Sequence, residues 1–334
     1  MREYGFELRL CATLEREGVP GLDGVSRRGI LSRQLGTSVE RAGARVVDVV
    51  FVEAGPGFED RVDLSPETIP PAAIESDAGV GRFRPITDVI DAPPEHARRI
   101  ASDAAEAGFF EAERRNGRTV VRQTARYPDW FNRLVGVENK PDLGSPGDLA
   151  RQIRHDVSLG VLDAVVLATS SYVTRAHRNR LPDGVGVWQV DFDRPDPIEV
   201  VREPTVRVPG GAGIEVLDSH PGRTDLLPVG ERAIDRQRRR IAERAYGKGW
   251  RTYRLPPCSH AANATVAGTA GLPGCHFLDR IVNPADECGT DCPGFDPEEP
   301  PAVDLDAERA ARTPWEPDPP GRRREQSSID RFIS

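Results

Sequence analysis

Hydrophobic positions at the start of the chain recur with helical spacing. Phe6, Leu10 and Leu14 are spaced four apart within residues 3–17, which predicts an amphipathic helix. Residues 45–52 (RVVDVVFV) form a short Val-rich run instead, which predicts a buried strand containing one acid, Asp48. Residues 53–80 are rich in Gly, Pro and Asp and are expected to form a long loop. The chain therefore opens with a predicted helix, a strand and a loop.

The pattern changes between residues 83 and 126. Residues 94–107 predict a helix. The segments on either side of Asn116-Gly117 predict a β-hairpin, because this dipeptide favours the tight turn between two strands. A helix followed by an Arg-bearing hairpin resembles a winged-helix module, and an ordinary α/β insertion is the alternative.

Strands and helices alternate in the next part of the chain. Three more strands are expected, at 133–140, 164–169 and 186–192. Helices are expected at 149–159, where Asp148 can act as the N-cap, and around 171–180. This order predicts an α/β fold in which a mixed sheet is flanked by helices.

Composition suggests a cellular setting. The 334 residues carry a net charge of −8, only 38% are hydrophobic, and Lys140 and Lys248 are the only lysines among 45 basic residues. These features are typical of a cytoplasmic protein from a salt-adapted archaeon. The sequence has no apolar run of about 18 residues and its N-terminus is charged, so neither a membrane span nor a signal peptide is expected.

The tripeptide Glu138-Asn139-Lys140 follows the apolar run Leu134–Val137. Alternate residues of a strand point to the same face, so Glu138 and Lys140 are expected to project together. A carboxylate beside an ammonium suits metal-assisted phosphodiester cleavage, in which the acid holds Mg²⁺ and the lysine orients water or stabilises developing charge. The alternative is a surface ion pair. The scarcity of lysine favours the catalytic interpretation, because a guanidinium does not replace an ammonium at such a site.

With this motif in place, the sequence resembles the PD-(D/E)xK nuclease superfamily over roughly residues 3–192. It also resembles a haloarchaeal family marked by the sequences VENKPDL and DVSLG. The superfamily has a helix with a Glu, a strand with an Asp, a strand ending in (D/E)xK, and a following helix that can carry Gln. The resemblance implies a restriction-endonuclease-like mixed sheet, with the winged-helix-like segment as an insertion.

The resemblance assigns roles to individual residues. Glu138 would be the central metal ligand, Lys140 the catalytic lysine and Gln152 an accessory residue of the site. Glu7 is preferred over Glu15 as the first-helix acid, because it is nearer the middle of the apolar face. His155 and Asp156, on the same helix as Gln152, are expected to be close by.

The Asp of the motif has two candidates. Asp129 supplies a literal Pro-Asp, but on one continuous strand its carboxylate would lie about 30 Å from that of Glu138, so a turn near Asn132 would be needed. Asp48 lies among four valines, and a buried carboxylate there must be partnered or bind metal. We prefer Asp48 and keep Asp129 as the second candidate. The expected cofactor at this site is Mg²⁺ or Mn²⁺.

Four of the five cysteines fall within 35 residues: Cys258, Cys275, Cys288 and Cys292. Four thiolates in a Gly- and Pro-rich segment suggest a small module that a metal holds together. Zn²⁺ and a [4Fe–4S] cluster both accept four thiolates. His260 and His276 are possible substitutes as ligands, and Cys11 could contribute to a cluster from the first helix.

The C-terminal sequence QSSIDRFIS matches the peptide pattern that binds the sliding clamp (proliferating cell nuclear antigen), after an acidic, Pro-rich segment expected to be a disordered linker. Its binding residues would be Gln326, Ile329, Phe332 and Ile333. The alternative is an amphipathic tail that packs on its own domain.

In the predicted helix 231–245, one face suits phosphate contact and carries Arg232, Arg236 and Arg240. A solvated, self-paired helix surface is the alternative there.

These observations predict a metal-dependent DNA nuclease that acts in replication or repair and is recruited by the sliding clamp. Five regions are expected: a nuclease-like domain (1–200) with an insertion at about 83–126, a connecting segment (201–250), a four-cysteine module (251–300), a linker (301–323) and the clamp-binding peptide (324–334). The main alternative is a catalytically silent adaptor that binds DNA or the clamp. A metal-dependent enzyme acting on another substrate is the third possibility.

Overall fold

The computed structural model describes residues 2–41, 43–145, 147–207 and 211–321. The chain divides into two compact units. The first comprises the chain up to Ala54 together with Phe131–Trp315, and Gly55–Trp130 form most of the second. Among the described residues, no helix is long and apolar enough to cross a membrane.

A six-stranded mixed sheet forms the centre of the first unit, in the order β1-β2-β6-β7-β8-β9. β1, β2 and β6 pair antiparallel, β6, β7 and β8 pair parallel, and β9 is antiparallel to β8. The strands are Gly29–Gly36, Val46–Ala54, Phe131–Asn139, Ala164–Thr169, Gly186–Val190 and Ile198–Arg202. The expected α/β class with a mixed sheet is confirmed. The two outer strands, β1 and β9, were not expected from the sequence.

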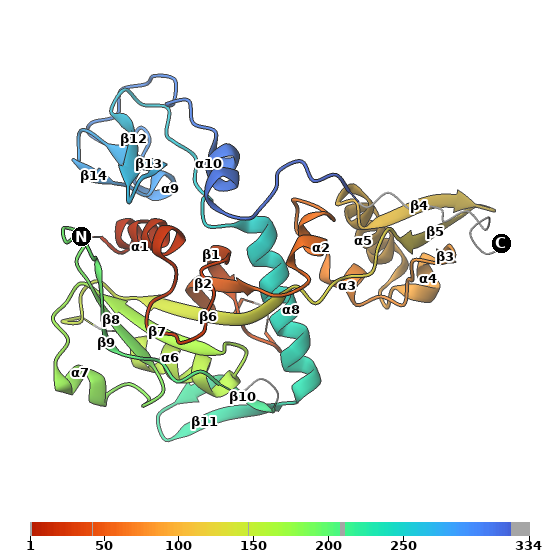
Figure 1. Cartoon of the computed structure of the whole chain (residues 1–334), viewed down its shortest axis with the longest axis horizontal. Coiled ribbons are helices and arrows are strands. Elements are labelled where there is room, and N and C mark those ends of the chain that lie inside the picture. Colours follow the sequence, from red (N-terminus) through yellow and green to blue (C-terminus); the bar gives the residue numbers. More distant parts are fainter. Residues whose placement is uncertain (1, 42, 146, 208–210, 322–334) are drawn as a thin grey trace, which may run out of the picture. The chain divides into compact units, whose positions relative to one another are not determined.

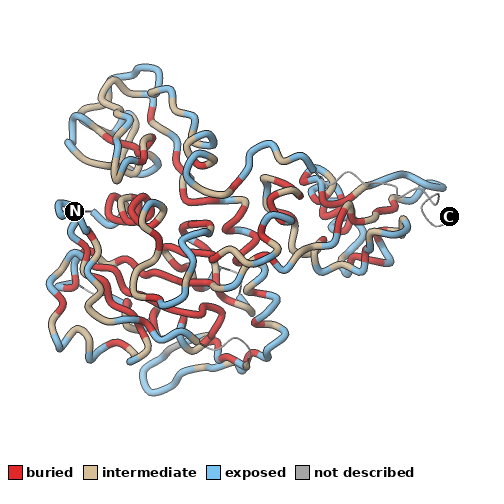
Figure 2. Tube along the Cα trace, in the orientation of Figure 1, coloured by how far each residue is buried: buried red, intermediate tan, exposed pale blue. Residues whose placement is uncertain are grey.

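Helices cover both faces of this sheet (Figure 1). Helix α1 (Glu3–Glu17), which was expected over the same residues, buries Phe6 and Leu10 against Val49 and Val137. Helix α6 (Leu149–Leu159) lies on the opposite side, and α8 (Glu231–Lys248) packs against β1. Figure 2 shows the resulting band of buried residues through the sheet and α1.

Helix termini differ in detail from the expectation. Asp148 occupies the N-cap of α6, but its side chain accepts no capping hydrogen bond from the helix backbone. Its carboxylate instead accepts a 2.6 Å hydrogen bond from Arg151. Helix α7 (Arg175–Asn179) is shorter than expected, because it begins only after Thr174, whose hydroxyl accepts from the backbone of His177.

The second unit contains a three-stranded sheet in the order β3-β5-β4. Its strands are Arg84–Pro85, Arg118–Gln123 and Phe110–Arg115, and its helices are α2 (Phe58–Val62), α3 (Pro71–Ile74), α4 (Ile86–Val89) and α5 (Pro94–Glu106). Asn116 and Gly117, at φ 50° and 75°, form the turn between β4 and β5, so the expected hairpin is confirmed. The region expected to be a plain loop, 53–80, contains α2 and α3.

The remaining part of the first unit forms small sheets that the sequence did not predict. A hairpin joins β10 (Gly213–His220) to β11 (Arg223–Val229), and a three-stranded sheet contains β12 (Ala261–Val266), β13 (Thr269–Cys275) and β14 (Arg280–Ile281). The short helix α9 (Pro284–Glu287) follows β14.

Part of the segment expected to be a disordered linker is ordered. It contains helix α10 (Leu305–Arg312), where the buried Arg309 side chain donates to the carbonyls of Tyr246 and Gly247 at the end of α8. The guanidinium also stacks on Trp315, 4.2 Å from the ring centre. These contacts give an acidic, Pro-rich sequence the partners that its composition alone does not reveal.

Candidate active site

Two carboxylates lie side by side where β2 begins and β6 ends. In the register of these strands Val49 is opposite Val137, so the next pair is Asp48 and Glu138, with both side chains on one face. The Asp48 carboxylate also accepts a 2.9 Å hydrogen bond from the backbone N–H of Asn139. The sheet therefore places two acids, far apart in the sequence, on neighbouring strands.

Glu7 on α1 joins these acids through side-chain hydrogen bonds. Its Oε2 accepts from Gln34 Nε2 at 2.9 Å and from Asn139 Nδ2 at 3.2 Å, and its Oε1 accepts from Arg33 Nε at 2.5 Å. Gln34 Nε2 also lies 3.3 Å from Asp48 Oδ1 and so bridges the two carboxylates. Glu7 is thereby part of the cluster.

Glu15, the other first-helix candidate, has a different environment. It accepts a 2.8 Å hydrogen bond from the indole of Trp250 and forms a buried ion pair with Arg251 at 2.6 Å. Its carboxylate is therefore already engaged in joining α1 to the chain that follows α8.

The strand beside Asp48 is strained at Gln34. This residue has φ 53° within β1, a left-handed conformation that costs a non-glycine residue about 1–3 kcal/mol. The ammonium of Lys248 donates to the carbonyls of Arg33 and Gln34 at 2.6 and 2.8 Å. Lys248 at the end of α8 thus holds the backbone that directs Gln34 between two carboxylates.

Arg45 lies between Glu138 and another buried acid, Asp156 on α6. Its guanidinium donates to both Asp156 oxygens, at 2.9 and 2.6 Å, and its Nη2 lies 2.5 Å from Glu138 Oε1. Although this contact is an ion pair, Glu138 Oε1 has no well-aligned hydrogen bond among the described residues. One guanidinium is thus shared by two buried carboxylates.

The protein environment disfavours ionisation of the acids in this cluster. Burial, followed by the nearby charge of Asp48, raises the pKa of Glu138 to about 8. Burial also raises the pKa of Asp48 and that of Glu7, although Arg33 opposes the effect at Glu7. With all three acids ionised, the cluster would hold more negative charge than its protein neighbours stabilise, and a bound cation would relieve this repulsion.

Lys140 and Gln152 lie on different sides of this arrangement. Lys140 Nζ is 3.4 Å from Glu3 on α1, while its backbone N–H donates to Ala168 on β7. Among the described residues, the Lys140 ammonium thus pairs with Glu3 on α1 and not with Glu138. Gln152 lines a polar cavity of about 450 Å³ together with Arg45, Arg151 and His155. Because Arg45 contacts Glu138, this cavity borders the carboxylate cluster.

Asp129, the second candidate for the motif Asp, lies in the second unit, just before β6. Strand β6 runs without interruption from Phe131 to Asn139, so the turn near Asn132 that would bring this side chain back is not formed. The geometry therefore favours Asp48.

The four-cysteine segment surrounds the end of β13 and helix α9. Cys275 ends β13, Cys288 follows α9, Cys292 donates its backbone N–H to Gly289, and Cys258 forms a β-bridge with Pro297. Burial raises the pKa of the Cys288 thiol, and the nearby thiols of the other three cysteines raise it further. Cys11 instead packs in the apolar core. Within the described ranges, no three His, Cys, Asp or Glu side chains are arranged to hold a metal ion.

The predicted basic face lies on α8. Arg232 and Arg236 are exposed there and Arg240 is half-buried. The predicted clamp-binding residues, Gln326, Ile329, Phe332 and Ile333, lie outside the described residues.

The site has four further members that the sequence did not indicate: Arg33, Gln34, Arg45 and Lys248. Of these four, only Lys248 stood out in the sequence, because it is one of two lysines.

No curated protein and no solved structure matches this chain. One family model matches residues 30–297, a stretch that includes Asp48, Glu138, Lys140 and all four clustered cysteines. The chain therefore belongs to DUF5787, a family of unknown function.

Proposed function

We propose that the protein is a metal-dependent DNA nuclease with a PD-(D/E)xK-like site. The observation that carries the proposal is the placement of Asp48 and Glu138 at the same level of adjacent strands. The surrounding order supports it: an acid on α1, an Asp on the second strand, Glu-x-Lys at the end of the third, and Gln152 on the following helix. This is the order that the superfamily resemblance implies.

The donor set fits a magnesium or manganese ion. Mg²⁺ is usually held by one or two carboxylates, with water and substrate phosphate oxygens completing the shell, so Asp48 and Glu138 suffice as protein ligands. The raised pKa of Glu138 and its oxygen without an aligned hydrogen bond agree with this role. When bound, the ion would polarise the phosphate and activate water.

The chain's own residues have separable tasks in this proposal. Lys140 would leave Glu3 and stabilise charge on the phosphate, since its ammonium is only partly buried, at 27% exposure. Arg45 holds Glu138 and Asp156, and with Gln152 it would bind phosphate in the polar cavity. The exposed arginines of α8 and a winged-helix-like second unit would add further contacts to DNA.

A cleavage assay tests this function. Wild-type protein is incubated with labelled single-stranded, double-stranded and flap DNA in Mg²⁺ or Mn²⁺, at low and at molar salt. We expect cleavage that EDTA stops and that Glu138→Gln and Lys140→Ala each reduce by at least about 100-fold. Arg194→Gln, at an exposed surface pair with Glu199, is the charge-matched control. If the wild type cuts no substrate yet binds DNA, the adaptor alternative replaces the nuclease.

We also propose that Cys258, Cys275, Cys288 and Cys292 bind Zn²⁺ or a [4Fe–4S] cluster. Between Cys275 and Pro297 only Val282 is fully buried, so this segment has little apolar core of its own. Metal analysis should find zinc or iron in the purified protein, and an absorbance band near about 400 nm would identify the cluster. Cys292→Ser should lose the metal and Cys11→Ser should retain it. The proposal would be contradicted if the wild-type protein contained no zinc or iron and adding either metal did not change its stability.

Recruitment by the sliding clamp is a proposal from the C-terminal sequence alone. Deleting residues 326–334 should abolish pull-down by the clamp and leave cleavage of naked DNA unchanged. Equal pull-down by the full and shortened chains would show that these residues do not bind the clamp.

A further inference from the structure

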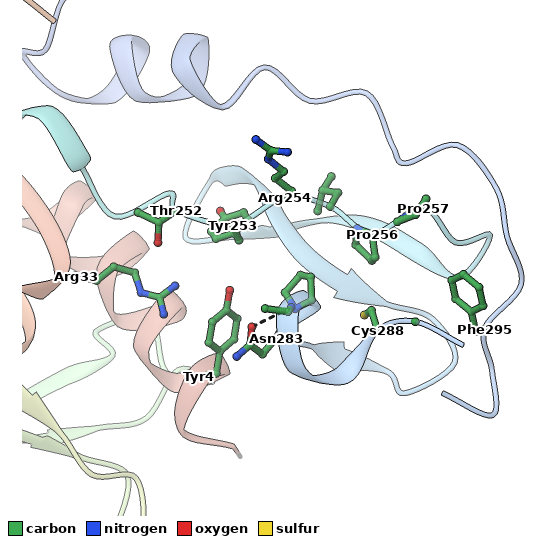
Figure 3. Close-up of a pocket in the computed structure, with 14 residues that line it drawn as sticks. Tyr4, Arg33, Thr252, Tyr253, Arg254, Pro256, Pro257, Asn283, Cys288 and Phe295 are labelled. Atoms are coloured by element: carbon green, nitrogen blue, oxygen red, sulfur yellow. Dashed lines mark hydrogen bonds between the residues drawn. The ribbon is translucent and has the colours of Figure 1, made fainter. Parts of the chain in front are cut away.

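A second cavity, separate from the polar one, is lined by Tyr4 of α1 and Arg33 of β1 (Figure 3). It has a volume of about 660 Å³, within the range of small-molecule pockets. One wall contains Tyr4 and Arg33. Tyr253 and Arg254, which belong to the segment after α8, also line the cavity. The opposite wall belongs to the four-cysteine module and includes Phe295. The cavity thus lies between that module and Arg33, whose side chain donates to Glu7 of the carboxylate cluster.

The cavity combines flat apolar surfaces with cationic groups. Tyr4, Tyr253, Phe295 and three prolines supply ring faces. The Arg33 guanidinium stacks on Tyr4, 4.8 Å from the ring centre. Arg254 is exposed, and within the described part of the chain it makes no hydrogen bond or ion pair. Ring faces beside a free guanidinium suit a heteroaromatic base with an attached phosphate.

One buried polar atom in the wall has no partner. Tyr253 is only 7% exposed, and its hydroxyl lacks a hydrogen bond among the described residues. A buried hydroxyl without a partner is costly, so a ligand that offers a donor or an acceptor would be stabilised there. The edge of a nucleobase offers both.

We propose that this cavity binds an unpaired nucleotide of a single DNA strand beside the carboxylate cluster. Arg33 supports this position, because it lines the cavity and also donates to Glu7 at 2.5 Å. A strand held here would therefore pass within one side chain of the cluster. The inference rests on the proposed nuclease function and adds that the substrate has an unpaired strand near the bond that is cut.

The test measures DNA binding without cleavage. Fluorescein-labelled oligothymidine and a blunt duplex are titrated with full-length protein in buffer without Mg²⁺ or Mn²⁺, and binding is followed by anisotropy. We expect Phe295→Leu and Arg254→Gln each to weaken oligothymidine binding by about five- to 100-fold and to leave duplex binding unchanged. Tyr253→Phe, which keeps the ring and removes the hydroxyl, should have a smaller effect in the same direction.

Two matched controls come from outside the cavity. Phe277→Leu changes an exposed ring on the same module, and Arg194→Gln removes an exposed charge elsewhere. Both should bind oligothymidine like the wild type. If the cavity variants also bind like the wild type, the cavity is not a strand site, whether or not the protein cleaves DNA. If they lose binding while wild-type protein cleaves nothing, the nuclease function fails and the strand site stands.

Discussion

The ionisation of Glu138 should make the metal-free protein less stable as pH rises. Its pKa is about 8 in the folded chain and near 4.5 when the carboxyl is free. The folded state therefore binds the proton more tightly than the unfolded state does. The stabilisation is complete below about pH 4.5 and is lost as pH rises through about 8. Each pKa unit of difference between the two states corresponds to about 1.4 kcal/mol, so the full loss of unfolding free energy is about 5 kcal/mol.

Urea unfolding without added Mg²⁺ or Mn²⁺, at about pH 5 and about pH 9, measures this loss. Glu138→Gln keeps the shape of the side chain and cannot ionise, so it removes this contribution to the pH dependence. We expect the variant to match the wild type at the lower pH and to exceed its stability by several kcal/mol at the higher pH. Adding Mg²⁺ should restore the stability of the wild type at high pH and should have little effect on the stability of the variant. A stability difference that does not change with pH would refute this reasoning.

Two other substitutions test contacts around the site. Lys248→Met removes the ammonium that donates to the carbonyls of Arg33 and Gln34, and it should lower the free energy of unfolding by about 2–3 kcal/mol in urea titrations. An unchanged value would show that the strained strand does not need this lysine. Glu15→Ala leaves buried Arg251 without its partner and should cost about 3–5 kcal/mol, measured by thermal denaturation followed by circular dichroism. A melting curve like that of the wild type would contradict this prediction and would mean that water solvates the charge of Arg251 in the variant.

Strong periodic segments could be predicted from the sequence. Helix α1, strand β7 and the Asn116-Gly117 hairpin formed where local pattern and turn chemistry agree. Strand β1 was missed because its sequence, GILSRQLG, places Ser32, Arg33 and Gln34 in succession, without alternation of polar and apolar residues. Those polar residues are accommodated by α1 and α8, and these contacts arise only in the tertiary structure.

The acids of the site could be proposed from the sequence, whereas their partners could not. Asp48 stands out as an acid among valines, and Glu138 stands out beside a rare lysine. Arg45 is one of many arginines, and only the packing of α6 against the sheet brings Asp156 within its reach. Lys248 likewise acquires its role through backbone carbonyls, which leave no trace in the sequence.

The most direct measurement of the account compares two aspartates in DNA cleavage. Initial rates are determined with labelled DNA and Mn²⁺ for wild type, Asp48→Asn and Asp129→Asn, with folding of each checked by circular dichroism. The account predicts cleavage by the wild type, loss of at least about 100-fold in Asp48→Asn, and nearly full activity in Asp129→Asn. Cleavage that survives Asp48→Asn, or wild-type protein that cuts no DNA, would contradict it.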